Sequence, residues 1–407
     1  MAKTTQKKAL IIGGGIAGPA AAIALQRAGI DAVVYEARET SQQNKGAFLT
    51  VARNGINALH TIDAFEAVMA RGFWVSQMEI YSGTGKHLGE MGSNAEGVGI
   101  ERSQLASALC DEALHRGIPI QTGKRLINAR TTPSGVTAQF EDGSLANGDL
   151  LIGADGIHSR VRNFIDAQAP TPKPVGLIGV GGWARVPGIQ TVPETFTFVL
   201  GKRAFFGWIP NPQGEIYWFA NIPYSLRADK PESQTLALVS RQEWKHRLLE
   251  LFAHDASPAA EIIRSTEEYD GFTATLLDML PHVPRWYRES MVLVGDAAHA
   301  ASPTSGQGAS LALEDSVMLA KSLRDSSDVQ QALTVYEALR RPRVEKVAKL
   351  ARRANRTKVA GPILRGLQDL LLPVVFKYVV HPEAETWLYH YRIDWGEQVS
   401  TEVVSTS

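Results

Sequence analysis

Three glycines near the start of the chain constrain its fold more than any other feature. Residues 9–12 are a short apolar run typical of a buried strand, and Gly13-x-Gly15-x-x-Gly18 follows at once. The stretch 17–28 is rich in alanine, as expected of a helix packed closely on a sheet. The order of strand, glycine turn and helix is typical of a βαβ unit, which needs a parallel sheet. We therefore expect an α/β fold.

The same turn has the properties of a phosphate-binding site. Its first glycine allows a tight turn, the second lets the backbone approach a pyrophosphate, and the third lets helix and strand pack closely. The helix N-terminus adds free N–H groups and a positive dipole end. A second apolar run, 32–35, ends at Glu36, roughly 20 residues beyond the last glycine, where a carboxylate can accept hydrogen bonds from ribose hydroxyls. A 2′-phosphate there would meet a like charge, so we expect an unphosphorylated ribose, as in NAD or FAD.

Composition and charge exclude several classes of protein. The 407 residues contain 42 Lys and Arg against 42 Asp and Glu, so no net charge draws the chain to nucleic acid or an anionic membrane. The single cysteine, Cys110, allows neither an internal disulfide nor a cysteine-based metal site, and we expect no metal. The sequence shows no signal-peptide core and no apolar run long enough to span a membrane. We expect a cytoplasmic protein without a nucleic-acid partner.

Two further motifs follow apolar runs later in the chain. Each begins with a glycine and an acid at the end of an expected buried strand, where a carboxylate can accept a hydrogen bond from a ligand hydroxyl. The motifs are Gly153-Ala-Asp155-Gly156-x-x-Ser159-x-x-Arg162 and Gly295-Asp296-Ala-Ala-His299, the second followed by Pro303 and Gly306-Gln307-Gly308.

Together the three motifs resemble the fingerprints of the group A flavoprotein monooxygenases, the para-hydroxybenzoate hydroxylase-like family. That family has, in this order, a GxGxxG, a DG motif (Asp-Gly-x-x-Ser-x-x-Arg) and a GD motif (Gly-Asp-Ala-Ala-His with a downstream Pro and Gly-Gln-Gly), and all three are complete here. The resemblance spans roughly residues 8–345. It implies FAD as the cofactor, with NADPH or NADH as the reductant and O2 as co-substrate. NAD(P)H would bind without a Rossmann domain of its own, because FAD takes the single GxGxxG.

The middle of the chain differs from its flanks. Residues 166–285 alternate aromatic and β-branched residues and predict an antiparallel sheet. Because nucleotide-binding patterns lie on both sides, we expect an α/β fold in which a Rossmann-like FAD-binding domain is interleaved with a β-rich substrate domain, plus C-terminal helices. The FAD-binding domain would comprise 1–165 and 286–357, with some strands near 73–100 joining the substrate sheet. Residues 358–407 would form a C-terminal helix and a flexible tail.

The resemblance implies roles for individual residues. Asp155 would position FAD and the incoming nicotinamide, and Pro303 would lie beside the reactive edge of the ring; these two are the candidate catalytic residues. The helix that starts near Ala309 would direct its N–H groups at the flavin N1–C2=O edge, which becomes negative on reduction. The expected cofactor-binding residues are Gly13, Gly15, Ile16, Ala17, Gly18, Glu36, Ala37, Arg38, Arg102, Asp155, Gly156, Arg162, Gly295, Asp296, Pro303, Gly306, Gly308 and Ala309.

The implied activity is hydroxylation of an aromatic or polyketide-like small molecule. NAD(P)H reduces FAD, reduced flavin adds O2 to give a C4a-hydroperoxide, and the distal oxygen attacks an electron-rich carbon. Aromatic side chains of the β-rich middle would suit a flat substrate, and Phe206, Trp208 and Trp218 are the candidate substrate contacts. The alternative for each of these three is an ordinary place in the core of the sheet. A monomer and a homodimer both fit the sequence.

Other readings stay open. Phe206-Gly207-Trp208-Ile209-Pro210 partly matches the Trp-x-Trp-x-Ile-Pro run of flavin halogenases. A flavoprotein that binds a metabolite without turnover is a third possibility, which NAD(P)H oxidation in air would separate from the first. The helical period from Leu364 to Tyr378 predicts a helix that either bridges the two domains or forms an interface. The segment 336–343 resembles the terminal helix signature of the family, and we expect it to serve packing and ion pairs.

Overall fold

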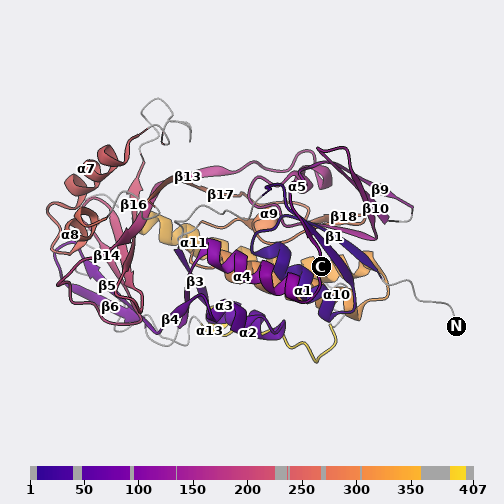
Figure 1. The fold of residues 1–407 in the computed structure, drawn as a ribbon, viewed down its shortest axis with the longest axis horizontal. Coiled ribbons are helices and arrows are strands. Elements are labelled where there is room, and N and C mark those ends of the chain that lie inside the picture. Colours follow the sequence, from indigo (N-terminus) through magenta and orange to yellow (C-terminus); the bar gives the residue numbers. More distant parts are fainter. Residues whose placement is uncertain are drawn as a thin grey trace.

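The computed structural model describes residues 7–39, 48–91, 96–133, 135–224, 236, 239–266, 272–302, 305–358 and 386–399, with backbone alone for 353–358. Two large sheets lie at opposite ends of an elongated molecule, and long helices lie along the first of them (Figure 1). The expected helix from Leu364 to Tyr378 falls outside the described residues.

The first sheet has six strands in the order β18-β19-β12-β1-β2-β8. β1 pairs in parallel with β2 and β12, β12 pairs in parallel with β19, and β18 runs antiparallel to β19. Four of the five residues of β1 are buried, as expected of a parallel strand covered on both faces. The strands are β1 (Lys8–Ile12), β2 (Asp31–Tyr35), β8 (Ile120–Gln121), β12 (Leu150–Gly153), β18 (Tyr287–Arg288) and β19 (Met291–Leu293).

Helices cover this sheet and pack on one another. The first nine residues of α1 are all buried, and the small alanines among them allow α1 to pack closely against its neighbours. Ser316 on α10 donates a hydrogen bond to the carbonyl of Ala17 on α1, at 3.2 Å. The helices of this half are α1 (Ala17–Arg27), α4 (Arg102–His115), α5 (Arg160–Ile165), α9 (Asp296–His299), α10 (Gly308–Asp325) and α11 (Val329–Lys358).

The second sheet has seven strands in the order β17-β13-β16-β15-β14-β5-β6. β5 and β6 come from the segment near 73–100 and pair within this sheet, β5 in parallel with β14. Its strands are β5 (Gln77–Ser82), β6 (His87–Met91), β13 (Lys173–Ala184), β14 (Thr195–Leu200), β15 (Phe205–Pro210), β16 (Ile216–Pro223) and β17 (Thr273–Met279). One face is covered by α7 (Arg241–Phe252) and α8 (Ala259–Arg264) (Figure 1).

Two three-stranded sheets complete the architecture. One has the order β11-β10-β9, and its strands are β9 (Leu126–Thr132), β10 (Gly135–Phe140) and β11 (Leu145–Gly148). The other has the order β3-β7-β4, and its strands are β3 (Phe48–Ala52), β4 (Phe73–Val75) and β7 (Gly97–Glu101). The other helices among the described residues are α2 (Arg53–Thr61), α3 (Phe65–Met69) and α13 (Thr386–Tyr389). The structure has the mixed α/β architecture that the sequence predicts.

The described helices include none that combines the length and the apolar character needed to cross a bilayer. Residues 386–399, which follow the undescribed segment, pack against the helices of the first half. Leu388 and Ile393 are buried there, and Arg324 donates to the carbonyl of Trp395 at 2.7 Å. The flexible tail is expected from Gln398 onward, and of that segment only residues 398 and 399 are described.

Candidate functional site

The glycine turn between β1 and α1 has three different local requirements. Gly13 has φ of 113°, and a Cβ on it would lie 2.4 Å from the carbonyl oxygen of Ala154. A Cβ on Gly18 would lie 1.9 Å from the carbonyl oxygen of Gly13, so this glycine is needed for helix and strand to touch. A Cβ on Gly15 would meet no atom within 4 Å. The first and third glycines therefore serve the fold, whereas the second leaves open space at the N-terminus of α1, which fits a pyrophosphate.

Glu36 lies directly beside this turn. Its carboxylate accepts hydrogen bonds from the N–H groups of Gly14, at 2.6 Å, and Arg38, at 3.0 Å. The Arg38 guanidinium lies 3.9 Å from the same carboxylate. These contacts hold Glu36, the residue after β2, at the glycine turn, where the hydroxyls of an adenosine ribose would reach its carboxylate.

Cys110 lies on α4 under the same turn. Its thiol lies 3.5 Å from the carbonyl oxygen of Gly14, and burial raises its pKa to about 12. Iodoacetamide is therefore expected to alkylate Cys110 on the order of a thousand times more slowly than a free thiol at pH 8, because almost no thiolate forms. A labelling time course followed by mass spectrometry, with glutathione as an internal reference and a urea-unfolded sample as the control, checks this. Alkylation of the folded protein at the glutathione rate would show that the turn does not cover the thiol.

The DG motif forms the loop from β12 into α5. The Asp155 carboxylate accepts hydrogen bonds from the N–H groups of Arg160, at 2.7 Å, and Val161, at 3.2 Å, and burial raises its pKa. Ser159 caps the helix by accepting from the N–H of Arg162, at 3.0 Å. Asp155 thus organises the loop that begins at Gly156, whose φ is 76°.

Arg162 has a structural role in this arrangement. Its side chain is 3% exposed and donates to the carbonyl oxygens of Ala297, at 3.0 Å, and Ile157, at 2.8 Å. The guanidinium thereby ties the DG loop to the GD motif. These two hydrogen bonds use two of the five N–H donors of the guanidinium, and the role of Arg162 in holding the cofactor stays a prediction.

Residues from distant segments converge at the GD motif. The Asp296 carboxylate lies 3.6 Å from the guanidinium of Arg102 at the start of α4, and both side chains are partly exposed. A Cβ on Gly308 would lie 3.9 Å from the same carboxylate. Asp296 and Gly308 both belong to the GD motif, whereas Arg102 comes from a segment almost 200 residues earlier, and the structure brings the three together. Gly306, with φ of 62°, and Ala309 lie on either side of Gly308, whereas Pro303 falls outside the described residues.

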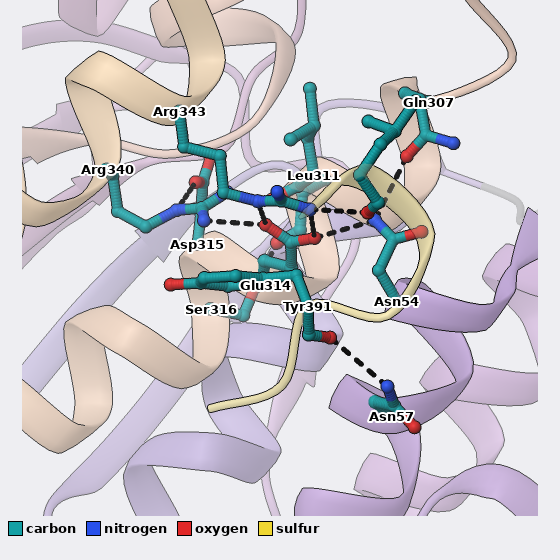
Figure 2. A network of polar contacts seen from close by, with 12 residues as sticks. Asn54, Asn57, Gln307, Leu311, Glu314, Asp315, Ser316, Arg340, Arg343 and Tyr391 are labelled. Carbon is teal, nitrogen blue, oxygen red and sulfur yellow. Dashed lines mark hydrogen bonds and ion pairs between the residues drawn. The ribbon is translucent and has the colours of Figure 1, made fainter. Parts of the chain in front are cut away.

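A buried network of charged side chains lies next to the GD motif (Figure 2). Arg340 is fully buried between the carboxylates of Glu314, at 2.6 Å, and Asp315, at 2.7 Å. Burial alone would raise the pKa of Asp315, but His299 and Arg340 hold it well below its ordinary value. Asp315 also accepts from the N–H of Gly295, at 2.9 Å, and so connects the network to the GD motif. The expectation of ion pairs for the segment 336–343 agrees with these contacts.

The three expected substrate contacts lie on the face of the seven-stranded sheet that α7 and α8 cover. Phe206 and Trp218 are fully buried and stacked, with ring centroids 5.6 Å apart, and Trp208 belongs to the same core. That core is shared with Trp244 and Phe252 of α7. The assignment of Phe206, Trp208 and Trp218 to the substrate is therefore corrected, because helices cover the face to which these three side chains point.

The opposite face carries a different aromatic cluster, which contains none of the three residues singled out from the sequence as substrate contacts. Alternation along each strand places its members on this side. Phe48, the first residue of β3, stacks on Tyr217 with centroids 4.7 Å apart and meets the Trp183 ring edge-on at 6.1 Å. Phe48 also pairs with Glu101, the neighbour of Arg102, in β7. We name this set the Phe48 cluster; its members are Phe48, Phe73, Val75, Met78, Trp183, Phe196, Phe198, Ile209, Tyr217 and Phe219.

Comparisons with known proteins agree with this geometry. A family model described as an FAD binding domain matches residues 6–351. The FAD-dependent urate hydroxylase of Klebsiella pneumoniae is 29% identical over 354 residues, which cover 85% of this chain and 89% of that protein. The aurachin C monooxygenase/isomerase of Stigmatella aurantiaca is 30% identical over 338 residues, which cover 81% and 84% of the two chains.

A solved structure shows the same fold. The crystal structure of Klebsiella pneumoniae HpxO complexed with FAD and uric acid superposes with a TM-score of 0.80 at 27% identity, and covers 90% of this chain and 93% of that one. The fold class and the FAD cofactor that the motifs predict are thereby confirmed. This chain belongs to the FAD binding domain family and is a group A flavoprotein monooxygenase.

Proposed function

We propose that this flavoprotein hydroxylates an aromatic small molecule, with NADH or NADPH as reductant and O2 as the source of oxygen. One oxygen atom enters the substrate, the other leaves as water, and NAD(P)H supplies the two electrons. The proposal rests on two contacts made by neighbouring residues. Arg102, at the start of α4, lies beside Asp296 of the GD motif. Glu101, the last residue of β7, pairs with Phe48 of the Phe48 cluster. The similarity to a urate hydroxylase and an aurachin C monooxygenase/isomerase supports an aromatic substrate.

The described residues are compatible with several parts of FAD. The space above Gly15 would take the pyrophosphate, Glu36 the adenosine ribose, and Asp296 with Arg102 the ribityl chain. The N-terminus of α10, from Gly308, would lie at the flavin N1–C2=O edge and stabilise negative charge there. When bound, FAD supplies the transfer of two electrons from NAD(P)H to O2.

The two proposed catalytic residues act beside the cofactor. Asp155, through its hydrogen bonds to the start of α5, would hold the DG loop at the place where FAD and the nicotinamide meet. Pro303, outside the described residues, remains the residue proposed for the reactive edge of the ring. Among the described residues no cluster of three acidic, histidine or cysteine side chains could hold a metal ion.

The Phe48 cluster is proposed as the substrate wall in place of the three corrected residues. It joins β3 of the FAD-binding part to the seven-stranded sheet, and the N–H of Phe48 lies 3.2 Å from the hydroxyl of Tyr217. Burial raises the pKa of Tyr217 to about 12, so its hydroxyl stays protonated at neutral pH. A dry aromatic wall of this kind suits a flat substrate and excludes water from the reaction.

Trp183 offers a specific test of this wall. Its indole Nε1 is buried and has no hydrogen-bond partner among the described residues, so a substrate oxygen would satisfy it. With the substrate identified below, Trp183→Phe is expected to raise KM about threefold to tenfold and leave kcat nearly unchanged, because a ground-state hydrogen bond is lost. Trp244→Phe is the matched control, since Trp244 has an equally unpartnered buried Nε1 within the described chain but lies under the other face. Equal KM values for all three proteins would remove Trp183 from the substrate wall.

The activity is tested with the purified FAD-bound protein in air. NADH and NADPH oxidation are followed across a panel of phenols, N-heteroaromatic compounds and polyphenolic antibiotics, with hydrogen peroxide quantified in parallel. We expect one class of compound to stimulate oxidation strongly while little peroxide accumulates. NAD(P)H consumption that yields only peroxide with every compound would contradict hydroxylation of these classes and favour a flavoprotein that binds a metabolite without turnover.

A further inference from the structure

Asn54, in the first turn of α2, joins two parts of the chain that lie far apart in sequence. Its side chain is buried, and its Nδ2 group lies 3.0 Å from Oε1 of Gln307 and 2.6 Å from Oε1 of Glu314 (Figure 2). Gln307 belongs to the loop before α10, whereas Glu314 lies nearly two turns inside that helix. A single amide therefore spans the loop and the body of α10.

The Glu314 end of this contact is held rigidly. Arg343 donates to both carboxylate oxygens at 2.7 Å, and Arg340 lies 2.6 Å from one of them. Arg343 is itself fixed, because its guanidinium lies 3.9 Å from the ring centroid of Tyr391 and donates to the carbonyl of Leu388 at 2.9 Å. The C-terminal segment thus locks the carboxylate that anchors Asn54.

The backbone of α2 is also held against α10. A Cβ on Gly55 would lie 2.6 Å from Oγ of Ser310, so the two helices approach as closely as a glycine permits. The N–H of Ala52 donates to the same Ser310 oxygen at 3.1 Å. Asn54 lies between these two contacts and has a fixed backbone from which to reach Gln307.

We propose that Asn54 is a positioning residue for the flavin end of α10. Anchored on Glu314, its amide holds the side chain of Gln307 and with it the loop from Gly306 to Gly308. The inference rests on the proposed placement of the α10 N-terminus at the flavin N1–C2=O edge. Donors held at a fixed position stabilise charge without reorganising, so the loop should favour the reduced, negatively charged flavin over the oxidised form.

Asn54→Ala tests the proposal in the FAD-bound protein. The ratio of affinities for reduced and oxidised FAD is expected to fall about threefold to tenfold, which is a midpoint potential about 15 to 30 mV lower for a two-electron couple. The visible flavin spectrum should shift as well. Asn57→Ala is the matched control, because Asn57 lies on the same helix and donates to the carbonyl of Tyr391 at 3.1 Å but contacts neither Gln307 nor Glu314. It should leave the potential at the wild-type value.

A double-mutant cycle distinguishes the proposed role of Asn54 from the proposed placement of the α10 N-terminus at the flavin. If Asn54 acts through Gln307, then Gln307→Ala lowers the potential by a similar amount and Asn54→Ala adds nothing to it. A shift with Gln307→Ala alone would overturn the role of Asn54 and leave the placement of α10 standing. No shift with either variant would overturn the placement, and the inference with it.

A measurement on the FAD-free protein covers the case in which Asn54→Ala does not retain FAD. Hydrogen exchange of the backbone amides at 306–310 should become faster in Asn54→Ala than in the wild type, and remain unchanged in Asn57→Ala. Unchanged exchange in Asn54→Ala would contradict the inference.

Discussion

Gly18→Ala is expected to destabilise the protein by about 3 kcal/mol and to abolish FAD binding, whereas Gly15→Ala is expected to lower FAD affinity alone. The added methyl of Gly18→Ala would lie 1.9 Å from the Gly13 carbonyl oxygen, a backbone atom that cannot move without separating α1 from β1. The methyl of Gly15→Ala meets nothing in the protein, so the FAD-free fold should change by no more than about 0.5 kcal/mol. It would instead occupy the space proposed for the pyrophosphate and weaken FAD binding at least about tenfold.

Urea unfolding of the FAD-free proteins and fluorescence titration with FAD measure the two effects separately. The two variants are matched, since each adds one methyl to the same turn. A Gly18→Ala protein that unfolds like the wild type would contradict the packing of the turn. A Gly15→Ala protein that binds FAD with wild-type affinity would contradict the placement of the pyrophosphate.

Arg340→Ala is expected to cost about 3–5 kcal/mol of stability and to yield little folded protein. Arg340 is fully buried between Glu314 and Asp315, so its removal leaves two carboxylates without this partner in the core. The position of Arg340 also explains why its pKa is raised. Burial disfavours the charged guanidinium, but the carboxylates of Glu314 and Asp315 stabilise it more strongly. The disturbance should reach the GD motif through Asp315, which accepts from the N–H of Gly295.

Arg247→Ala is the comparison for this variant. Arg247 forms an ion pair with Glu243 on the surface of α7, where both side chains are about half exposed. Surface pairs of this kind contribute between about 0 and 1 kcal/mol, so the unfolding midpoint should hardly move. Equal losses of stability in Arg247→Ala and Arg340→Ala, measured by urea unfolding, would show that the charge network is not the buried core described above.

The nucleotide-binding part could be predicted because each of its motifs is contiguous. The turn from Gly13 to Gly18 lies between one strand and one helix, and its three requirements follow from backbone geometry within a few residues. Asp296 was also predicted from the GD motif, and Arg102 from the family resemblance. The pairing of these two side chains at 3.6 Å depends on the strand order, which no local pattern contains.

The sequence alone does not distinguish the proposed substrate wall from the covered core of the same sheet. Alternation along β15 separates Phe206 and Trp208 from Ile209, so the sequence shows two faces but not which of them meets the FAD-binding part. That choice depends on α7 and α8, which follow later in the chain and cover one face.

Asn54 illustrates a second limit of sequence reasoning. No pattern near Asn54 in the chain shows what its side chain contacts, because its two partners, Gln307 and Glu314, lie more than 250 residues away. Its burial and its contacts both depend on the close approach of α2 to α10. The C-terminal segment was missed for the same reason, since Tyr391 and Leu388 acquire their role only on Arg343.

The most direct test of the central claim is a turnover in 18O2. The FAD-bound protein is supplied with NADH or NADPH and the stimulating compound from the aromatic panel, and the product is analysed by mass spectrometry. The account predicts that the product gains one oxygen atom and that this atom comes from 18O2, with no label incorporated when 18O-labelled water is used with ordinary O2. A product oxygen that comes from water, or complete NAD(P)H consumption without an oxygenated product, would contradict a monooxygenase.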